Sequence, residues 1–213
     1  DSEKAYELGH GLDWYSSRVY FQPRIFYRYV DDYIQGTPAK DPVVIAVSTM
    51  NGDSTPLQFS NVDAKFYGAD TDWGVTLGNN WSLDGVVSYV RGKRDDASDD
   101  LYRIAPLNAR TSLTYTRSKW WAAIEGVVYA QQNKVSKTNS EKKTDGYQVL
   151  NLRGGIEVTQ GLFLDAGIEN IFDSGARDHL AGINRVADSD VGLNKRLPGA
   201  GRNFYATLQY RYN

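Results

Sequence analysis

Hydrophobic and polar residues alternate one by one along the last ten positions of the chain. Between residues 204 and 212 every second side chain is apolar or aromatic, and the side chains between them include Thr207, Gln209 and Arg211. A period of two residues predicts a β-strand with one apolar and one polar face. Tyrosines near the end of the apolar face and an arginine on the polar face are typical of a strand whose outside meets lipid and whose inside meets water.

The same alternation recurs along the rest of the chain, so the sequence predicts nine strands. Their apolar faces span residues 6–14, 19–29, 62–77, 81–89, 107–115, 120–130, 150–158, 162–168 and 204–212. The inward, polar faces carry Arg24, Arg28, Asp84, Arg110, Glu125, Arg153, Glu157, Asp165, Glu169 and Arg211. A dry core could not hold so many charges, because each unpaired charge costs several kcal/mol when it loses water. The polar face is therefore predicted to be wet, which argues against a soluble β-sandwich binding module.

The links between the predicted strands alternate strictly between short and long. The turns at 15–17, 78–80, 117–119 and 159–161 are short, whereas the links 34–57, 94–105, 132–146 and 170–203 are much longer. All short turns are therefore predicted at one end of the sheet and all long loops at the other, as in outer-membrane barrels.

Two local features refine this picture. Trp14, Trp81 and Trp120 flank short turns, where an aromatic girdle at the membrane boundary would lie. Within residues 62–77 the apolar positions change parity near Gly68, which predicts a β-bulge there.

Composition and charge exclude several classes of protein but do not identify one. The 213 residues have a formal net charge of -2, which gives no indication of nucleic-acid binding, and no cysteine, which excludes disulfides and thiolate metal sites. The longest near-candidate for an apolar span, residues 43–47, is far shorter than the roughly 18 residues of a transmembrane helix. The chain starts next to a strand without a signal peptide, so we expect a mature product or a piece of a longer protein. Nine strands favour a piece, because bacterial single-chain barrels have even numbers.

Several stretches resemble a known family. Residues 161–173 (Gly-Leu-Phe-Leu-Asp-Ala-Gly-Ile-Glu-Asn-Ile-Phe-Asp) are similar to the penultimate strand of TonB-dependent outer-membrane receptors, which typically ends x-G-x-x-N-L-F-D. Residues 177–180, 184–186 and 197–204 are similar to the last external loop and the entry to the closing strand, and residues 61–68 resemble a recurrent strand of the family. The R-D-H-L and N-R-V sequences in the last loop resemble receptors for metals, copper included, more than receptors for large siderophores.

The resemblance implies an all-β, transmembrane, antiparallel up-and-down β-barrel of about 22 strands, in the outer membrane of a Gram-negative bacterium. Residues 1–213 would form its last nine strands, with the N-terminal plug domain and the earlier strands absent. The implied function is active import of a metal ion or a metal chelate such as a siderophore, with no enzyme activity and no cofactor. The implied partners are the lipid bilayer, lipopolysaccharide, the plug domain, a TonB-type energy transducer and the cargo.

An alternative is a small free-standing porin-like or structural barrel. The charged inward residues would then line a pore or form an internal ladder of ion pairs, whereas in a receptor they would face the plug. The sequence does not identify the cargo.

The candidate cargo-contacting residues lie in the longest link and are Arg177, Asp178, His179, Asn184 and Arg185. His179 beside Asp178 is a weak metal candidate, with loop packing as the alternative. One such histidine with no cysteine and a single methionine cannot form a transition-metal site alone, so other ligands would have to come from outside this segment. The loop could instead be a lid that contacts only neighbouring loops.

The other polar groups give weaker indications. His10 has outward parity, which disfavours a ligand role. Asp31-Asp32 and residues 95–100 are compatible with calcium, although a solvated external loop is the favoured interpretation. Ser174 near His179 is too little to indicate a hydrolase, so no catalytic residue is predicted.

Overall fold

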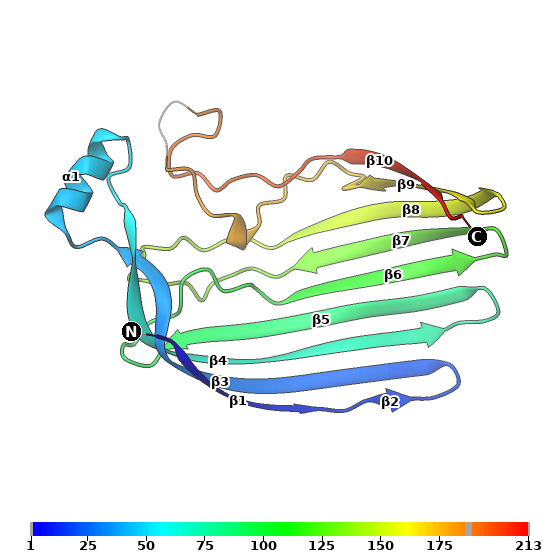
Figure 1. Cartoon of the computed structure of the whole chain (residues 1–213), viewed down its shortest axis with the longest axis horizontal. Helices are drawn as coiled ribbons and strands as arrows, with labels where there is room; N and C mark the ends of the chain where they lie inside the picture. The colour runs from blue at the N-terminus through cyan, green and yellow to red at the C-terminus, as the bar shows by residue number, and fades with distance from the viewer. Residues whose placement is uncertain (1, 186–188, 213) are drawn as a thin grey trace.

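One antiparallel sheet contains all the strands of the described residues (Figure 1). The computed structural model describes residues 2–185 and 189–212. The strands are β1 (Lys4–Gly11), β2 (Trp14–Tyr15), β3 (Val19–Pro38), β4 (Leu57–Thr76), β5 (Trp81–Arg94), β6 (Asn108–Thr116), β7 (Trp120–Tyr129), β8 (Tyr147–Thr159), β9 (Leu162–Glu169) and β10 (Asn203–Tyr210). Each strand pairs with the next one in the order β1-β3-β4-β5-β6-β7-β8-β9-β10, and β2 pairs with β3 beside this path.

The predicted nine-strand, up-and-down arrangement is confirmed, with β1 and β2 as two halves of the first strand. The interruption between them lies opposite Pro23, because Gly11 pairs with Arg24 and Trp14 with Phe21. Proline has no amide hydrogen to give to a ladder, and Leu12 still donates its amide hydrogen to the carbonyl of Pro23 at 3.0 Å. The break is therefore local and does not change the direction of the strand.

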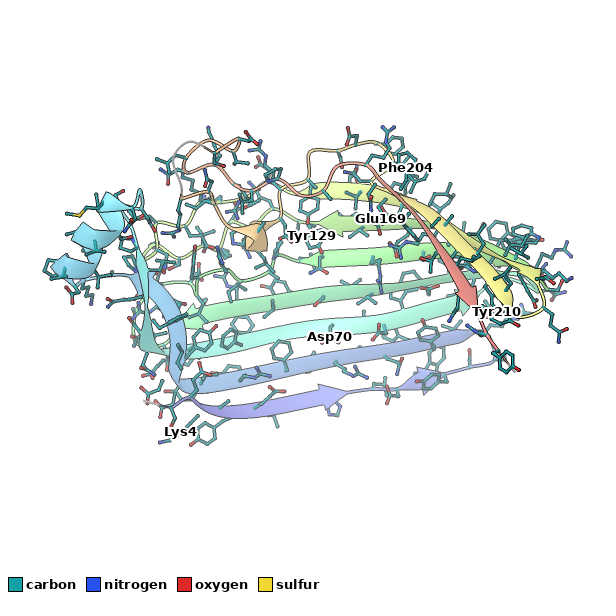
Figure 2. All side chains as sticks on the ribbon, turned by 45° about the horizontal axis from the view of Figure 1, so that its top comes forward. Lys4, Asp70, Tyr129, Glu169, Phe204 and Tyr210 are labelled. Atoms are coloured by element: carbon teal, nitrogen blue, oxygen red, sulfur yellow. The ribbon has the colours of Figure 1, made fainter. Side chains whose placement is uncertain are left out.

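The short and the long connections lie at opposite ends of the sheet, as predicted (Figure 1). Residues 16–18, 77–80, 117–119 and 160–161 form the short turns, and residues 39–56, 95–107, 130–146 and 170–202 form the long loops. We call the two ends the turn rim and the loop rim. Figure 2 shows Lys4 at the loop rim and Tyr210 near the turn rim.

The first long loop contains a helix that the sequence analysis did not predict. β3 and β4 extend further than expected, and α1 (Pro42–Met50) lies between them. Asp41 caps α1 by accepting a hydrogen bond from the amide of Val43 at 2.8 Å, and Pro42 occupies the first turn, where its missing amide hydrogen costs nothing. Among the described residues, no helix has the length and apolar character needed to cross a membrane.

The strand register assigns each residue to one of two faces, because directly paired residues share a face. Trp81 pairs with Tyr115, and the ring centroids of Trp81–Tyr115 and Tyr115–Trp120 are 4.8 and 5.3 Å apart. These aromatic rings form a belt near the turn rim on the face predicted to point outward. A second group of outward tyrosines lies nearer the loop rim and consists of Tyr27, Tyr67 and Tyr89, all exposed. Two aromatic belts on one face are typical of a membrane barrel.

The inward face carries a small apolar cluster near the loop rim. Val30, Val62 and Ala64 are buried there against Leu101, which belongs to the loop after β5. This cluster explains why the prediction of a β-bulge at Gly68 is wrong. The apolar residues of β4 change parity because the loop covers the inward face at one end of the strand, while the pairing of Gly68 with Phe26 and Val90 stays regular.

The register shifts that do occur lie elsewhere. One falls in β3 between Val30 and Tyr33, where Asp32 has a φ of 57°, and the other falls in β8 between Glu157 and Thr159. The side chain of Asn61 donates to the carbonyl of Asp32 at 2.8 Å, so the residues extruded by the first bulge are tied to β4.

Glycines on the inward face lie under aromatic rings of the adjacent strands. A Cβ atom at Gly68 would lie 2.7 Å from the ring of Phe26, one at Gly74 would lie 2.3 Å from the ring of Tyr20, and one at Gly167 would lie 2.6 Å from that of Tyr205. At Gly68 the carbonyl oxygen of Tyr89 is closer still, at 2.2 Å. The rings thus lie against bare backbone, which requires glycine at these positions.

We predict that Gly68→Ala destabilises the barrel by about 1–3 kcal/mol, because the new methyl group overlaps backbone as well as a ring. Gly126→Ala is the matched control, since a Cβ atom there has no neighbour within 4 Å. The urea midpoint of the protein reconstituted in phospholipid vesicles measures both effects. Equal midpoints for the two variants would contradict the packing argument.

We also predict that Leu208→Arg impairs folding into membranes far more than Gln209→Arg. Leu208 is 66% exposed on the outward face, and a cation on a lipid-facing position costs about 2–4 kcal/mol at the midplane and less toward either surface. Gln209 is its neighbour on the inward face, where water can solvate the charge. The measurement is the folded fraction in lipid vesicles, and a larger loss for Gln209→Arg would reverse the assignment of the faces.

Candidate functional site

Two features can meet a solute or a partner: the charged inward face and the long loops above it. On the inward face, Glu125 of β7 lies between arginines of the adjacent strands. Nη2 of Arg153 is 3.0 Å from Oε1 of Glu125 and 3.6 Å from Oε1 of Glu169, and Nε of Arg110 is 3.9 Å from Oε2 of Glu125. The predicted mixed-sign stripe therefore forms ion pairs across β6 to β9.

Hydrogen bonds made by Asn151 extend this charge network toward the loop rim. The side-chain amide of Asn151 donates to Oε1 of Glu125 at 2.9 Å, and the Oδ1 atom of Asn151 accepts from the backbone amide of Asn170 at 2.9 Å. The Glu125 side chain is only 9% exposed, so these contacts replace water around its carboxylate. A buried carboxylate that accepts from several donors fixes the positions of those donors.

The loop between β5 and β6 is tied to the loop between β7 and β8 through one carboxylate. Asp99 accepts hydrogen bonds from the backbone amides of Lys137 and Thr138, both at 2.8 Å, and from the hydroxyl of Ser136 at 3.3 Å. Burial raises the pKa of Asp99, but these amide hydrogen bonds outweigh it and hold the pKa at about 2. Asp99 is therefore ionised at neutral pH and locks the two loops together.

A second buried carboxylate joins three loops. Glu141 accepts from the backbone amides of Arg103 at 3.0 Å and Ser136 at 2.9 Å, and its Oε1 lies 3.1 Å from Nε2 of His179. Nδ1 of His179 is 2.7 Å from the hydroxyl of Thr144. His179 is 2% exposed, so its ring is enclosed by the loop between β7 and β8.

Two arginines complete the connections of the last loop. Arg196 donates to the carbonyls of His179 and Lys142, and desolvation lowers the pKa of its guanidinium. Arg185 donates to the carbonyl of Thr55 and lies 3.8 Å from Asp53, in the segment that follows α1. The last loop is thus tied both to the loop between β7 and β8 and to the loop that contains α1.

The five candidate residues of the last loop therefore do not converge on one point. His179 faces Thr144 and Glu141, whereas the carboxylate of Asp178 accepts from the amide of Leu180 at 2.9 Å as the N-cap of the 3₁₀ turn η1 (His179–Ala181). Asn184 is buried and bonded to the carbonyl of Val191. Arg177 is exposed and makes no hydrogen bond or ion pair within residues 2–185 and 189–212. Val186, part of the N-R-V sequence, lies outside the described residues.

The carboxylates of the acidic run 95–100 also do not converge on one point. Asp95 pairs with Lys65, Asp96 with Arg94 and Asp100 with Arg91, while Asp99 binds backbone amides. In the part of the chain that the structure describes, no three side chains among histidine, aspartate and glutamate are grouped so that they could hold a metal ion.

Sequence reasoning did not identify Glu141, Thr144 or Arg196, and it considered Asp99 only as part of the acidic run 95–100, not as a link between loops. Each acts through a contact with a residue far away in the chain, such as the separation of 35 positions between Thr144 and His179. Loops have no periodicity that would reveal such partners, so the sequence contained no usable signal for them.

Comparison with protein families assigns this architecture to a class. The family model described as TonB dependent receptor-like, beta-barrel matches residues 3–171. The chain therefore belongs to the TonB-dependent receptor family of outer-membrane barrels. Proteins of this family are transporters, which agrees with the prediction that the chain is not an enzyme. A search of curated protein sequences gives no match.

Solved structures give more particular likenesses. The copper transporter OprC superposes with a TM-score of 0.87 at 27% sequence identity, over 98% of this chain and 31% of that protein. The FrpB iron transporter from Neisseria meningitidis and the ferric yersiniabactin uptake receptor FyuA from Yersinia pestis have TM-scores of 0.70 and 0.69 at 14% identity. They share the fold and cover 99% of this chain, which spans 31% and 30% of their lengths. The chain therefore corresponds to less than a third of each of these proteins.

We predict that the contact between residues 95–107 and 130–146 weakens in acid. Because the pKa of Asp99 falls from 3.8 to about 2 on folding, its stabilising contribution is complete above about pH 4 and is lost as the pH falls through 2. Hydrogen exchange of the Lys137 and Thr138 amides measures this loss. In Asp99→Asn, both amides should exchange faster at neutral pH and should show little further change in acid. Unchanged protection in the variant would show that Asp99 is not the lock.

Proposed function

We propose that this chain forms part of the barrel wall and the external loops of a receptor that imports a metal ion or a metal chelate. The observation that carries the proposal is the superposition on a copper transporter over 98% of the chain with a TM-score of 0.87. In this proposal, residues 1–213 are the C-terminal part of a larger barrel in the outer membrane of a Gram-negative bacterium. The plug domain and the earlier strands belong to the rest of the protein, and a TonB-type transducer supplies the energy.

The two edges of the sheet favour this proposal over a small free-standing barrel. Within the described residues, β1 pairs only with β3, and β10 pairs only with β9. Unpaired backbone groups at both edges would be costly in lipid, where no water can satisfy them. Further strands beside β1 and β10 would pair these groups, and such strands are what the longer relatives supply.

The two faces of the sheet suggest two sets of partners. The outward face, with its aromatic belts, fits the lipid bilayer and lipopolysaccharide. The inward face, with Glu125, Arg153 and Glu169 in one network, fits a polar partner such as a plug domain, because Glu169 and Arg153 keep 45% and 34% of their side chains exposed. Those exposed atoms leave hydrogen-bonding capacity for a second surface.

The contacts of the last loop favour a lid more than a cargo site. Asp178, His179 and Arg185 all have partners within this loop or in neighbouring loops. Only Arg177, among the five candidates, is exposed without such a partner in the described residues. We infer that this loop closes the external mouth of the barrel and that Arg177 is the residue of the loop that contacts the cargo.

The test removes residues 183–197 from the full-length receptor and replaces them with a short glycine–serine link. We expect uptake of radioactive copper or of a ferric siderophore to fall to the level of cells without the energy transducer, at unchanged surface abundance, because the mouth loses its lid contacts. Arg185→Gln should reproduce part of the loss, and Lys143→Gln, an exposed neighbour on the loop between β7 and β8, is the control.

Normal uptake by the deletion variant would remove the loop from the mechanism. Leakage of unrelated small solutes through the intact protein, independent of the energy transducer, would favour the porin-like alternative.

A further inference from the structure

A small cavity lies where the last loop meets two other long loops. Arg103 lines it from the loop between β5 and β6, Glu141 from the loop between β7 and β8, and His179 and Gly182 from the last loop. We call it the cap cavity, and its volume is about 30 Å³. Because one buried water needs roughly 10–15 Å³, the cap cavity has room for a single small ion and is too small for a metal chelate.

The residues around the cap cavity carry an excess of positive charge. Among the described residues that line it, Glu141 is the one with a carboxylate, and four are basic: Arg103, Lys142, Arg185 and Arg196. The Glu141 carboxylate is 4% exposed and already accepts from the backbone amides of Arg103 and Ser136. It therefore neutralises only part of the surrounding charge, and the cavity favours an anion.

Two side chains of the cap cavity have donors without an acceptor. The guanidinium of Arg103 makes no hydrogen bond or ion pair within residues 2–185 and 189–212, and its charged group lies over the ring of Tyr102, 5.3 Å from the centroid. The Nε2 atom of His179 is buried and lies 3.1 Å from Glu141, but it makes no hydrogen bond in the described part of the chain. When Nδ1 of this ring accepts from the hydroxyl of Thr144, the ring hydrogen is on Nε2 and is free to bind an anion.

The backbone of the last loop brings the Arg103 guanidinium to the cavity. Gly182 has a φ of 80°, and a Cβ atom there would lie 2.2 Å from Nη2 of Arg103. A side chain at this position would therefore displace the guanidinium. The glycine allows a charged group from the loop between β5 and β6 to lie directly against the last loop.

Arg103 and Arg196 also repel each other across this region. Burial lowers the pKa of the Arg196 guanidinium, and the charge of Arg103 lowers it further, while Glu141 acts in the opposite direction. The hydrogen bonds of Arg196 go to the backbone carbonyls of Asp178, His179 and Lys142, which carry no net charge. An anion between the two guanidinium groups would reduce their repulsion.

We propose that the cap cavity binds one small inorganic anion of about the size of chloride, and that this anion holds the last loop closed. Arg103 and His179 would donate to the anion, and Arg196 would contribute charge. Because Arg103 and His179 belong to different loops, the anion would join the two loops directly. The proposal concerns the closure of the loops and does not depend on which cargo is imported.

The first experiment is a crystal structure of the full-length receptor grown in sodium bromide. Bromide replaces chloride in such sites, and its anomalous scattering identifies it. We expect a bromide peak beside Arg103 in the wild type and none in Arg103→Gln. Lys143→Gln, an exposed neighbour of Lys142 outside the cavity, is the matched control and should keep the peak. A wild-type cavity without bromide, or a peak retained in Arg103→Gln, would overturn the proposal.

The second experiment measures the closure of the loop in solution. The amide of Leu197 donates to the carbonyl of Gly182 at 3.2 Å, so its hydrogen exchange reports the opening of the last loop beside the cavity. The full-length receptor is compared in chloride and in gluconate of equal ionic strength, because gluconate is too large for the cavity. For a dissociation constant of about 20 mM, ~200 mM chloride should slow this exchange about tenfold relative to gluconate.

The variants separate the cap cavity from other effects of salt. Arg103→Gln should exchange the Leu197 amide at the same rate in both salts, whereas Lys143→Gln should show the wild-type difference. Equal exchange of the wild type in the two salts would contradict the role in closure. A wild-type response to chloride in Arg103→Gln would also contradict it, because chloride would then act at another place.

Discussion

The continuous antiparallel ladder is the constraint on which the rest of the structure depends. In lipid, every backbone amide and carbonyl must find its partner within the protein, and here each strand from β3 to β9 is paired on both sides. The ladder fixes which side chains share a level, so it brings Arg110, Glu125 and Arg153 together from three strands. In the strands that the structure describes, the irregularities are the break opposite Pro23 and two register shifts, in β3 and β8.

The long loops are held together by a different principle. Their apolar contacts are few, and the connections between them depend on buried carboxylates that collect backbone amides, with Asp99 and Glu141 as the two examples. A carboxylate can serve donors from several segments at once, which suits loops that have no regular partner. His179 and Arg196 then attach the last loop to this framework, so that four loops form one connected cap over the inward face.

The sequence allowed the fold to be predicted much better than the site. Alternation records the face of every residue in a strand, so strand positions, faces and the two rims could all be inferred. The same rule failed at Gly68, because the apolar residues Val62, Ala64 and Phe66 face inward under Leu101, a residue that arrives from another loop. The helix α1 was missed because its short apolar run was weighed only as a membrane span. The partners of His179, Thr144 and Glu141, lie in a loop that is distant in the sequence, and no local sequence pattern indicates such a contact.

The aromatic rings that lie over glycines have a consequence for the shape of the inward wall. A ring flat against bare backbone, as Tyr20 lies on Gly74 and Tyr205 on Gly167, fills the space that two projecting side chains would otherwise occupy. At these positions the inward wall therefore presents one aromatic ring in place of two separate side chains, so the surface that meets the interior there is aromatic, in contrast to the ion pairs between β6 and β9.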